Sequence, residues 1–217
     1  MGNAFVKWGW LILAAAPLAA QDHAPRPAGA ARIAAQAATP TGTPGTAAEQ
    51  IAGAVLAAPP ELRDDATVLG YSPDGKFVEL RKGTGGMVCL ADDPKEARFH
   101  VACYHKSLET FMARGRELTA QGVSGSPRDS IRNADIIAGR IKMPAAGGLY
   151  TLTARAGCYD AATGKLCDHN NPVHSVYVPF ASIETTGLLD HPTDEHTPYL
   201  MDAGTAKAHI MFGKHEH

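Results

Sequence analysis

Histidine is the residue type in this sequence that offers the most chemistry. The chain has 217 residues and contains ten histidines, three of which, His105, His174 and His209, lie in or beside predicted strands. Neutral imidazoles that converge at strand ends, with Asp92 or Asp93 nearby, would suit zinc, copper or iron(II). The residues therefore suggest a divalent transition metal as the possible cofactor, although no cofactor is expected from any motif.

An ordinary structural role is the alternative for these histidines. The sequence has no HExxH motif and no pair of alternate histidines within a predicted strand. Histidine is often intermediate in burial, with its ring bonded to backbone. We favour this interpretation for His174 and His209 over a metal site.

The four cysteines, Cys89, Cys103, Cys158 and Cys167, are a second candidate for chemistry. In an exported chain an even number of cysteines favours disulfides, and pairing by nearness in sequence gives Cys89 with Cys103 and Cys158 with Cys167. Four cysteines allow three pairings, so the other two stay open. A zinc site built from all four thiolates is a further alternative, but neither pair has the short C-x-x-C type of spacing.

Two further patterns resemble catalytic motifs and fail on inspection. The glycine-rich segment at residues 83–86 is not followed by the GK[ST] of a phosphate-binding loop, so we interpret it as a turn. The segment GVSGS at residues 122–126 would need glycine in place of Ser126 to be a nucleophile elbow. No serine or cysteine hydrolase site is therefore predicted.

The N-terminal residues are predicted to be a signal peptide followed by a linker. Lys7 precedes an apolar run that ends in small residues near Ala20, the pattern of a secretory signal peptide at residues 1–20. The run is shorter than the roughly 20 apolar residues of a membrane span. Residues 21–45 are rich in Ala, Pro and Thr, which predicts a flexible tether, and residues 46–217 form a single globular domain.

Local signals predict the elements of that domain. Thr46 and Glu49 match a capping box that begins a helix at 46–57, and a second helix is expected at 105–121. Residues 128–135 form a short polar helix or loop. Strands are predicted by alternation and flanking turns at 66–71, 76–81, 87–90, 99–104, 136–143, 149–154, 173–180, 198–201 and 207–212. The fold class is α+β, a disulfide-stapled, mainly antiparallel sheet of about seven to nine strands with two main helices.

Three phrases of this domain carry a resemblance: FHVACYHK, MVCLADDP and PYLMDAGTAKAHIMF. They resemble a group of uncharacterised secreted bacterial proteins with a Cys-Leu-x-Asp-Asp/Met-Pro segment, here Cys89 to Pro94. The group ends in a P-[YW]-[VLI]-M-x-x-G-T-x-x-A-H-[IL]-M segment, here Pro198 to Met211. The resemblance covers residues 46–212 and implies an exported single domain, and it assigns no activity or catalytic residue.

Composition and motifs together favour a binding protein. The formal charge of −2 leaves no basic field for nucleic acid or anionic membranes, and no membrane span remains after the signal is removed. We expect a periplasmic or secreted, non-catalytic module whose partner is a small ligand or an envelope protein. The alternative is a metal-dependent enzyme that uses the histidines. A binding module should show an apolar pocket or groove, whereas an enzyme should gather several polar side chains around one cavity.

Overall fold

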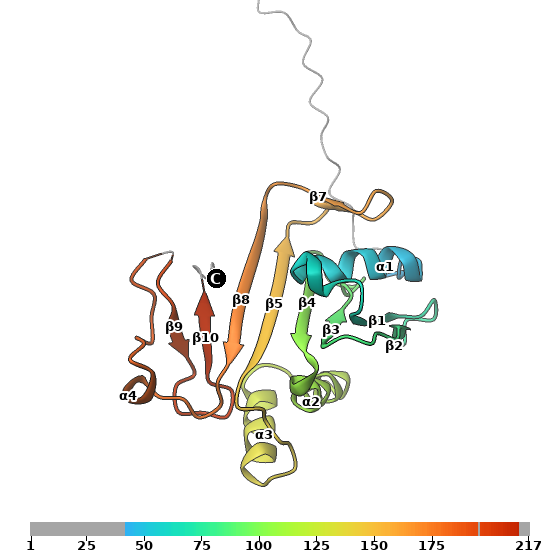
Figure 1. Cartoon of the computed structure of the whole chain (residues 1–217). Coiled ribbons are helices and arrows are strands. Elements are labelled where there is room, and N and C mark those ends of the chain that lie inside the picture. Colours follow the sequence, from blue (N-terminus) through green and yellow to red (C-terminus); the bar gives the residue numbers. More distant parts are fainter. Residues whose placement is uncertain (1–41, 195, 213–217) are drawn as a thin grey trace, which may run out of the picture. The chain divides into compact units, whose positions relative to one another are not determined.

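One large sheet organises the chain (Figure 1). The computed structural model describes residues 42–194 and 196–212, so the predicted signal peptide and residues 21–41 of the predicted tether lie outside the described residues. Within the described residues, eight strands form this sheet in the order β2-β1-β3-β4-β5-β8-β10-β9. The strands are β1 (Thr67–Tyr71), β2 (Phe77–Arg81), β3 (Met87–Leu90), β4 (Phe99–His105), β5 (Gly147–Ala154), β8 (Asn170–Tyr177), β9 (Tyr199–Met201) and β10 (His209–Phe212).

All neighbouring strands of this sheet are antiparallel except one pair. The hairpin of β1 and β2 closes through Ser72 and Gly75, as the turn sequence predicts. β3 then runs parallel to β1, with Val68 opposite Cys89. The mainly antiparallel α+β fold is therefore confirmed, while the parallel β1–β3 pair was not anticipated.

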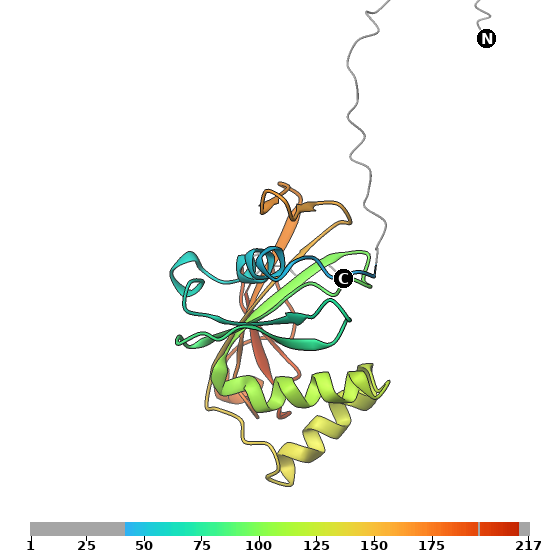
Figure 2. The ribbon, with the colours of Figure 1, turned by 90° about the vertical axis from the view of Figure 1, so that its right-hand side faces the viewer.

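Helices cover both faces of the sheet, as Figure 2 shows. The helical elements of the described residues are α1 (Ala47–Ala54), the 3₁₀ helices η1 (Val55–Ala57), η2 (Pro60–Leu62) and η3 (Lys106–Leu108), α2 (Glu109–Ala120), α3 (Gly125–Ile137) and α4 (Ile183–Thr186). The predicted capping box is present at Thr46 and Glu49. Among the described residues, no helix has both the length and the apolar character to cross a membrane.

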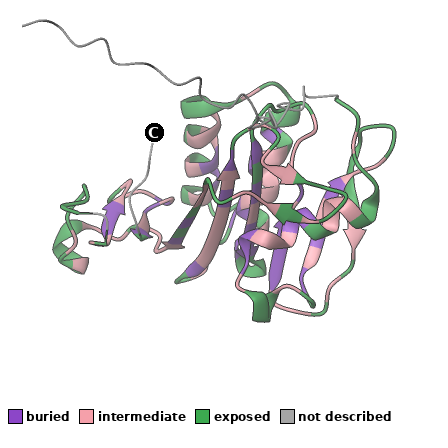
Figure 3. Cartoon of the chain, turned by 90° about the horizontal axis from the view of Figure 1, so that it is seen from above, coloured by how far each residue is buried: buried purple, intermediate pink, exposed green. Residues whose placement is uncertain are grey.

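Alternation along β4 places two apolar cores back to back. Val101 and Cys103 face α1, where Ala54 is fully buried in the same cluster. Tyr104 faces the opposite side and packs with Leu108 at the start of the second helical layer. Figure 3 shows the buried residues gathered along the strands, with exposed residues on the loops and outer helix surfaces.

Both predicted disulfides are confirmed. Cys89 and Cys103 lie directly opposite each other on β3 and β4. The second bond joins Cys158 and Cys167 at the base of a separate two-stranded ribbon, β6 (Tyr159–Asp160) and β7 (Lys165–Leu166). No thiolate is therefore left for a zinc site, because all four cysteines are oxidised.

The predicted strand at 136–143 is wrong. Its first two residues end helix α3, and Gly139 follows in the left-handed conformation at φ 71°. The error has a physical cause, because the buried positions of α3 are the charged residues Arg132 and Asp135. Arg132 pairs with Asp129 in the same helix, while Asp135 pairs with Arg114 and Arg140 outside it. Charged residues therefore stand where the usual apolar stripe of a helix would be.

Candidate functional site

The structure does not bring the three candidate histidines together. His174 on β8 pairs with Tyr150, whereas His209 on β10 lies opposite Tyr177, three positions further along β8. Because side chains alternate along a strand, His174 and His209 point to opposite faces of the sheet. His105 is at the end of β4, two strands away from β8.

Two of the three histidines make local hydrogen bonds instead. The ring nitrogen Nδ1 of His105 accepts a hydrogen bond from Ser107 N–H and helps to begin η3. His209 donates from Nδ1 to the carbonyl of Lys207 at 2.9 Å. Asp92 and Asp93 lie in the β3–β4 loop, and in the described part of the chain no three His, Cys, Asp or Glu side chains are grouped closely enough to hold a metal ion.

A hollow of about 290 Å³ lies between the start of α1, the β3–β4 loop and the β6–β7 ribbon. We call it the acidic pocket. Its lining residues are Thr43, Pro44, Gly45, Glu49, Gln50, Gly53, Ala54, Asp92, Pro94, Glu96, Ala97, Phe99, Gly157, Tyr159 and Ala161. Three of these described lining residues are carboxylates, and none is Lys, Arg or His.

Backbone-directed bonds of Gln50 fix α1 beside the sheet. Its side-chain amide donates to Tyr71 O and to Gly45 O at 2.8 Å each, while its carbonyl accepts from Tyr71 N–H at 2.8 Å. Residues 42–45, predicted as the end of the tether, also bond to the β3–β4 loop, since Gly42 N–H donates to Pro94 O. Helix α1 is therefore attached to β1, and the segment before it is attached to the β3–β4 loop.

Asp92 is the carboxylate of the acidic pocket with the most unusual electrostatics. Burial raises its pKa to about 6, and the negative charges of Asp93 and Glu96 add to the increase. One hydrogen bond opposes this, because His100 N–H donates to Asp92 Oδ1 at 2.7 Å. A positive group brought into the pocket would relieve this unfavourable setting.

An aromatic pair forms the apolar wall of the acidic pocket. The rings of Phe99 and Tyr159 stack with their centroids 4.5 Å apart. Tyr159 also donates from its hydroxyl to Glu49 O at 3.2 Å, which connects the β6–β7 ribbon to α1. Gly53 permits this contact, because a Cβ there would lie 3.0 Å from the Tyr159 ring.

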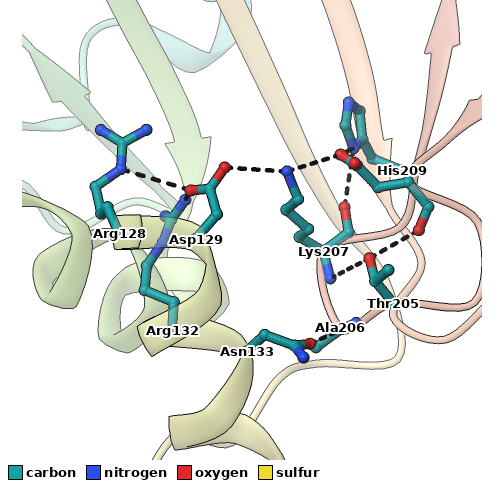
Figure 4. Close-up of polar contacts among 9 residues, drawn as sticks. Arg128, Asp129, Arg132, Asn133, Thr205, Ala206, Lys207 and His209 are labelled. Carbon is teal, nitrogen blue, oxygen red and sulfur yellow. Dashed lines mark hydrogen bonds and ion pairs between the residues drawn. The ribbon is translucent and has the colours of Figure 1, made fainter. Parts of the chain in front are cut away.

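A second hollow of about 270 Å³, which we call the polar hollow, lies between α3 and the segment before β10. Its lining residues are Ser126, Asp129, Ser130, Asn133, Thr205 and Lys207. Figure 4 shows Asp129 between the guanidinium of Arg132 and the ammonium of Lys207. Partial burial opposes the charge of Lys207, but hydrogen bonds to Asp129 and Asp202 raise its pKa.

The polar hollow offers less to a ligand than the acidic pocket. Asp129 Oδ1 lies 2.6 Å from Arg132 Nη2 and Oδ2 lies 3.0 Å from Lys207 Nζ, so this carboxylate is already paired with two cations. Asn133 accepts from Ala206 N–H and joins α3 to the segment before β10. We therefore interpret this cluster as structural, because it holds α3 to the segment before β10. No aromatic or aliphatic side chain is present among its described lining residues.

Sequence reasoning named Asp92 only as a neighbour of a metal site. Glu49 and Tyr159 line the acidic pocket together with Asp92, and no local pattern connects them to the β3–β4 loop. The sequence feature that could have indicated the acidic pocket is the group of acidic residues at 92–96, which precedes a strand that begins with Phe99. No protein-family model, curated protein or solved structure matches the chain, so the site rests on this geometry.

Proposed function

We propose that this chain is an exported binding module whose acidic pocket takes a small organic cation, a molecule with an ammonium or guanidinium group. One observation carries the proposal: the acidic pocket combines Glu49, Asp92 and Glu96 with an aromatic wall and no basic side chain among its described lining residues. Ligand pockets of proteins are mostly apolar with a few placed polar groups, and about 290 Å³ lies at the small end of their range.

Charge supports a cation as the ligand. The charged neighbours that act on Asp92 are Asp93 and Glu96, so its carboxylate is held half-buried in a negative field. An ammonium or guanidinium would neutralise this field and form a charge-assisted hydrogen bond. An anionic ligand would be repelled by the three carboxylates that line the pocket, Glu49, Asp92 and Glu96.

Two other observations support a binding role in an oxidising compartment. Both cysteine pairs are oxidised, as is usual in exported proteins. The carboxylates of the acidic pocket have no neighbouring histidine or serine among its described lining residues to complete an acid–base pair. The histidine-based metalloenzyme loses its support, since the three histidines lie apart in the part of the chain that the structure describes.

Calorimetric titration of the purified oxidised chain tests the proposal. The probes are butylammonium and butylguanidinium, with butanol and butanoate as neutral and anionic counterparts of similar size. We expect the two cations to bind at pH 7.5 and their counterparts not to. Replacing Asp92 by Asn should weaken cation binding by about tenfold or more, because a charge-assisted hydrogen bond is lost while the shape is kept.

Glu61→Gln is the matched control, because it removes one carboxylate from an exposed position outside the acidic pocket. It should bind the cations as the unaltered chain does. Equal affinity of Asp92→Asn and the unaltered chain would contradict the proposal, as would preferential binding of butanoate.

A further inference from the structure

The structure points to redox control of the acidic pocket. We infer that the Cys158–Cys167 disulfide holds the pocket in its binding form and that a dithiol reductant opens it reversibly. The inference rests on the proposed function, because it describes how that same pocket is regulated.

The β6–β7 ribbon is short, and the disulfide closes it. It pairs only Tyr159 with Leu166 and Asp160 with Lys165, and it is separate from the eight-stranded sheet. A two-stranded ribbon is marginal in water by itself, and here Cys158, Tyr159 and Leu166 also pack against the main core. The bond between Cys158 and Cys167 closes its base, beside the backbone bond from Cys167 N–H to Cys158 O at 2.9 Å.

The same ribbon supplies one wall of the acidic pocket. Gly157, Tyr159 and Ala161 line the pocket, and they lie at or next to β6. Tyr159 reaches across to Phe99 by stacking and to Glu49 O by its hydroxyl. If the ribbon loses its shape, the Tyr159 ring is no longer fixed and the apolar wall keeps only Phe99.

The two disulfides differ in access. Cys89 and Cys103 are both 0% exposed, enclosed between α1 and the sheet. Cys158 and Cys167 are only partly buried at the base of the ribbon. Thiol–disulfide exchange requires the attacking thiolate to reach a sulfur atom, so the ribbon disulfide should react first.

The exchange balances with one dithiol. A thiolate of the reductant attacks one sulfur of Cys158–Cys167, the protein S–S bond breaks, and a mixed disulfide forms while the other cysteine takes up a proton. The second thiol of the reductant then displaces the first cysteine, which is also protonated. The protein gains two thiols, and the reductant loses two electrons and two protons as it becomes a disulfide.

Native-state alkylation tests the order of reduction. The folded chain is exposed to increasing dithiothreitol, quenched with iodoacetamide, and mapped by mass spectrometry. We expect Cys158 and Cys167 to be labelled while Cys89 and Cys103 stay oxidised. Labelling of all four cysteines together would overturn the inference.

Binding and hydrogen exchange test the consequence. In the selectively reduced chain, amide exchange at residues 157–161 should become faster. Butylammonium affinity should fall about tenfold or more, because apparent affinity falls in proportion to the population of the binding form, here about a tenth or less. Both should recover on reoxidation. The double variant Cys158→Ser/Cys167→Ser should show the weaker affinity and no response to dithiothreitol.

The outcomes separate the two proposals. Selective reduction with unchanged exchange and affinity would overturn redox control and leave cation binding intact. A chain that binds no cation in either state contradicts the proposed function alone. Hydrogen exchange then decides the inference, because faster exchange supports opening of the ribbon and unchanged exchange refutes it.

Discussion

Asp92 gains its proposed role at a cost in stability. Its pKa rises from 3.8 to about 6 on folding, so the folded chain holds more protons than the unfolded chain between about pH 4 and pH 6. The free energy of unfolding therefore falls as pH rises through that window, and the cost is fully present above pH 6. The side chain that would attract a cation also weakens the empty protein.

Asp92→Asn should therefore stabilise the chain at pH 7 while it weakens cation binding. We expect a gain on the order of 1–2 kcal/mol, reduced from the full effect of the pKa change because the group is partly screened by solvent. Urea unfolding at pH 7 and at pH 4 measures it, and most of the gain should be lost at pH 4. A variant less stable than the parent at pH 7 would show that the carboxylate is favourably paired.

Thr46 and Asp92 show which residue-level features a sequence can reveal. The capping box of Thr46 and Glu49 spans three residues, so its chemistry is visible in the sequence itself. The pKa of Asp92 is raised first of all by burial, which the residues around position 92 do not reveal. That burial is created by the fold and cannot be predicted from the residues adjacent to Asp92 in the sequence.

Helix α3 is attached to α2 through charge more than through apolar contact. Asp135 is 6% exposed and accepts hydrogen bonds from Arg114 Nε and Arg140 Nε, at 2.8 Å each. These bonds hold the pKa of Asp135 below its usual value. The resulting stability is present above the unfolded pKa and is lost as pH falls through the folded pKa.

Asp135→Ala should destabilise the chain by on the order of 2 kcal/mol at pH 7, because it leaves Arg114 without a buried partner. The control is Glu117→Gln, which removes the exposed partner of the same arginine and should change stability by less than about 0.5 kcal/mol. Thermal unfolding monitored by circular dichroism compares them. Equal losses would show that the α2–α3 attachment does not depend on Asp135.

The glycine-rich turn before β3 is explained by close packing of backbones. A Cβ at Gly83 would lie 2.3 Å from Asp65 O and from Thr67 N, whereas one at Gly86 would meet only the His105 ring at 3.3 Å. Gly83→Ala should therefore cost about 3 kcal/mol, since backbone must move. Gly86→Ala should be nearly neutral in the same urea titration, and the opposite ranking would contradict this account.

Elements with local signals were predictable, whereas for α3 the sequence left open a short polar helix or a loop at 128–135. The hairpin at 67–81 and the helices that begin at 47 and 106 have turn or capping sequences. Helix α3 buries Arg132, which lies over the Phe111 ring at 4.0 Å, and its polar sequence hides that contact. The parallel pairing of β1 with β3 was also hidden, because strand order depends on contacts between segments that are distant in sequence.

The two disulfides contribute to different parts of the whole molecule. Cys89–Cys103 joins adjacent central strands and is enclosed by the α1-side core, whereas Cys158–Cys167 closes a ribbon outside the main sheet. Cooperative unfolding of a small domain reports chiefly on its main core. The Cys89–Cys103 bond should therefore contribute more to the free energy of global unfolding. The Cys158–Cys167 bond should contribute more to the shape of the acidic pocket.

Cys89→Ala/Cys103→Ala should lower the free energy of unfolding by about 3 kcal/mol or more, the amount expected for cross-linking a loop of this length. Cys158→Ala/Cys167→Ala should lower it by about 1 kcal/mol or less, because the ribbon can open while the sheet stays folded. Urea unfolding of both oxidised variants gives the comparison. If the second pair proved equally damaging, the ribbon would unfold together with the sheet. Reduction would then denature the protein, so a reversible switch at the acidic pocket requires that the two losses differ.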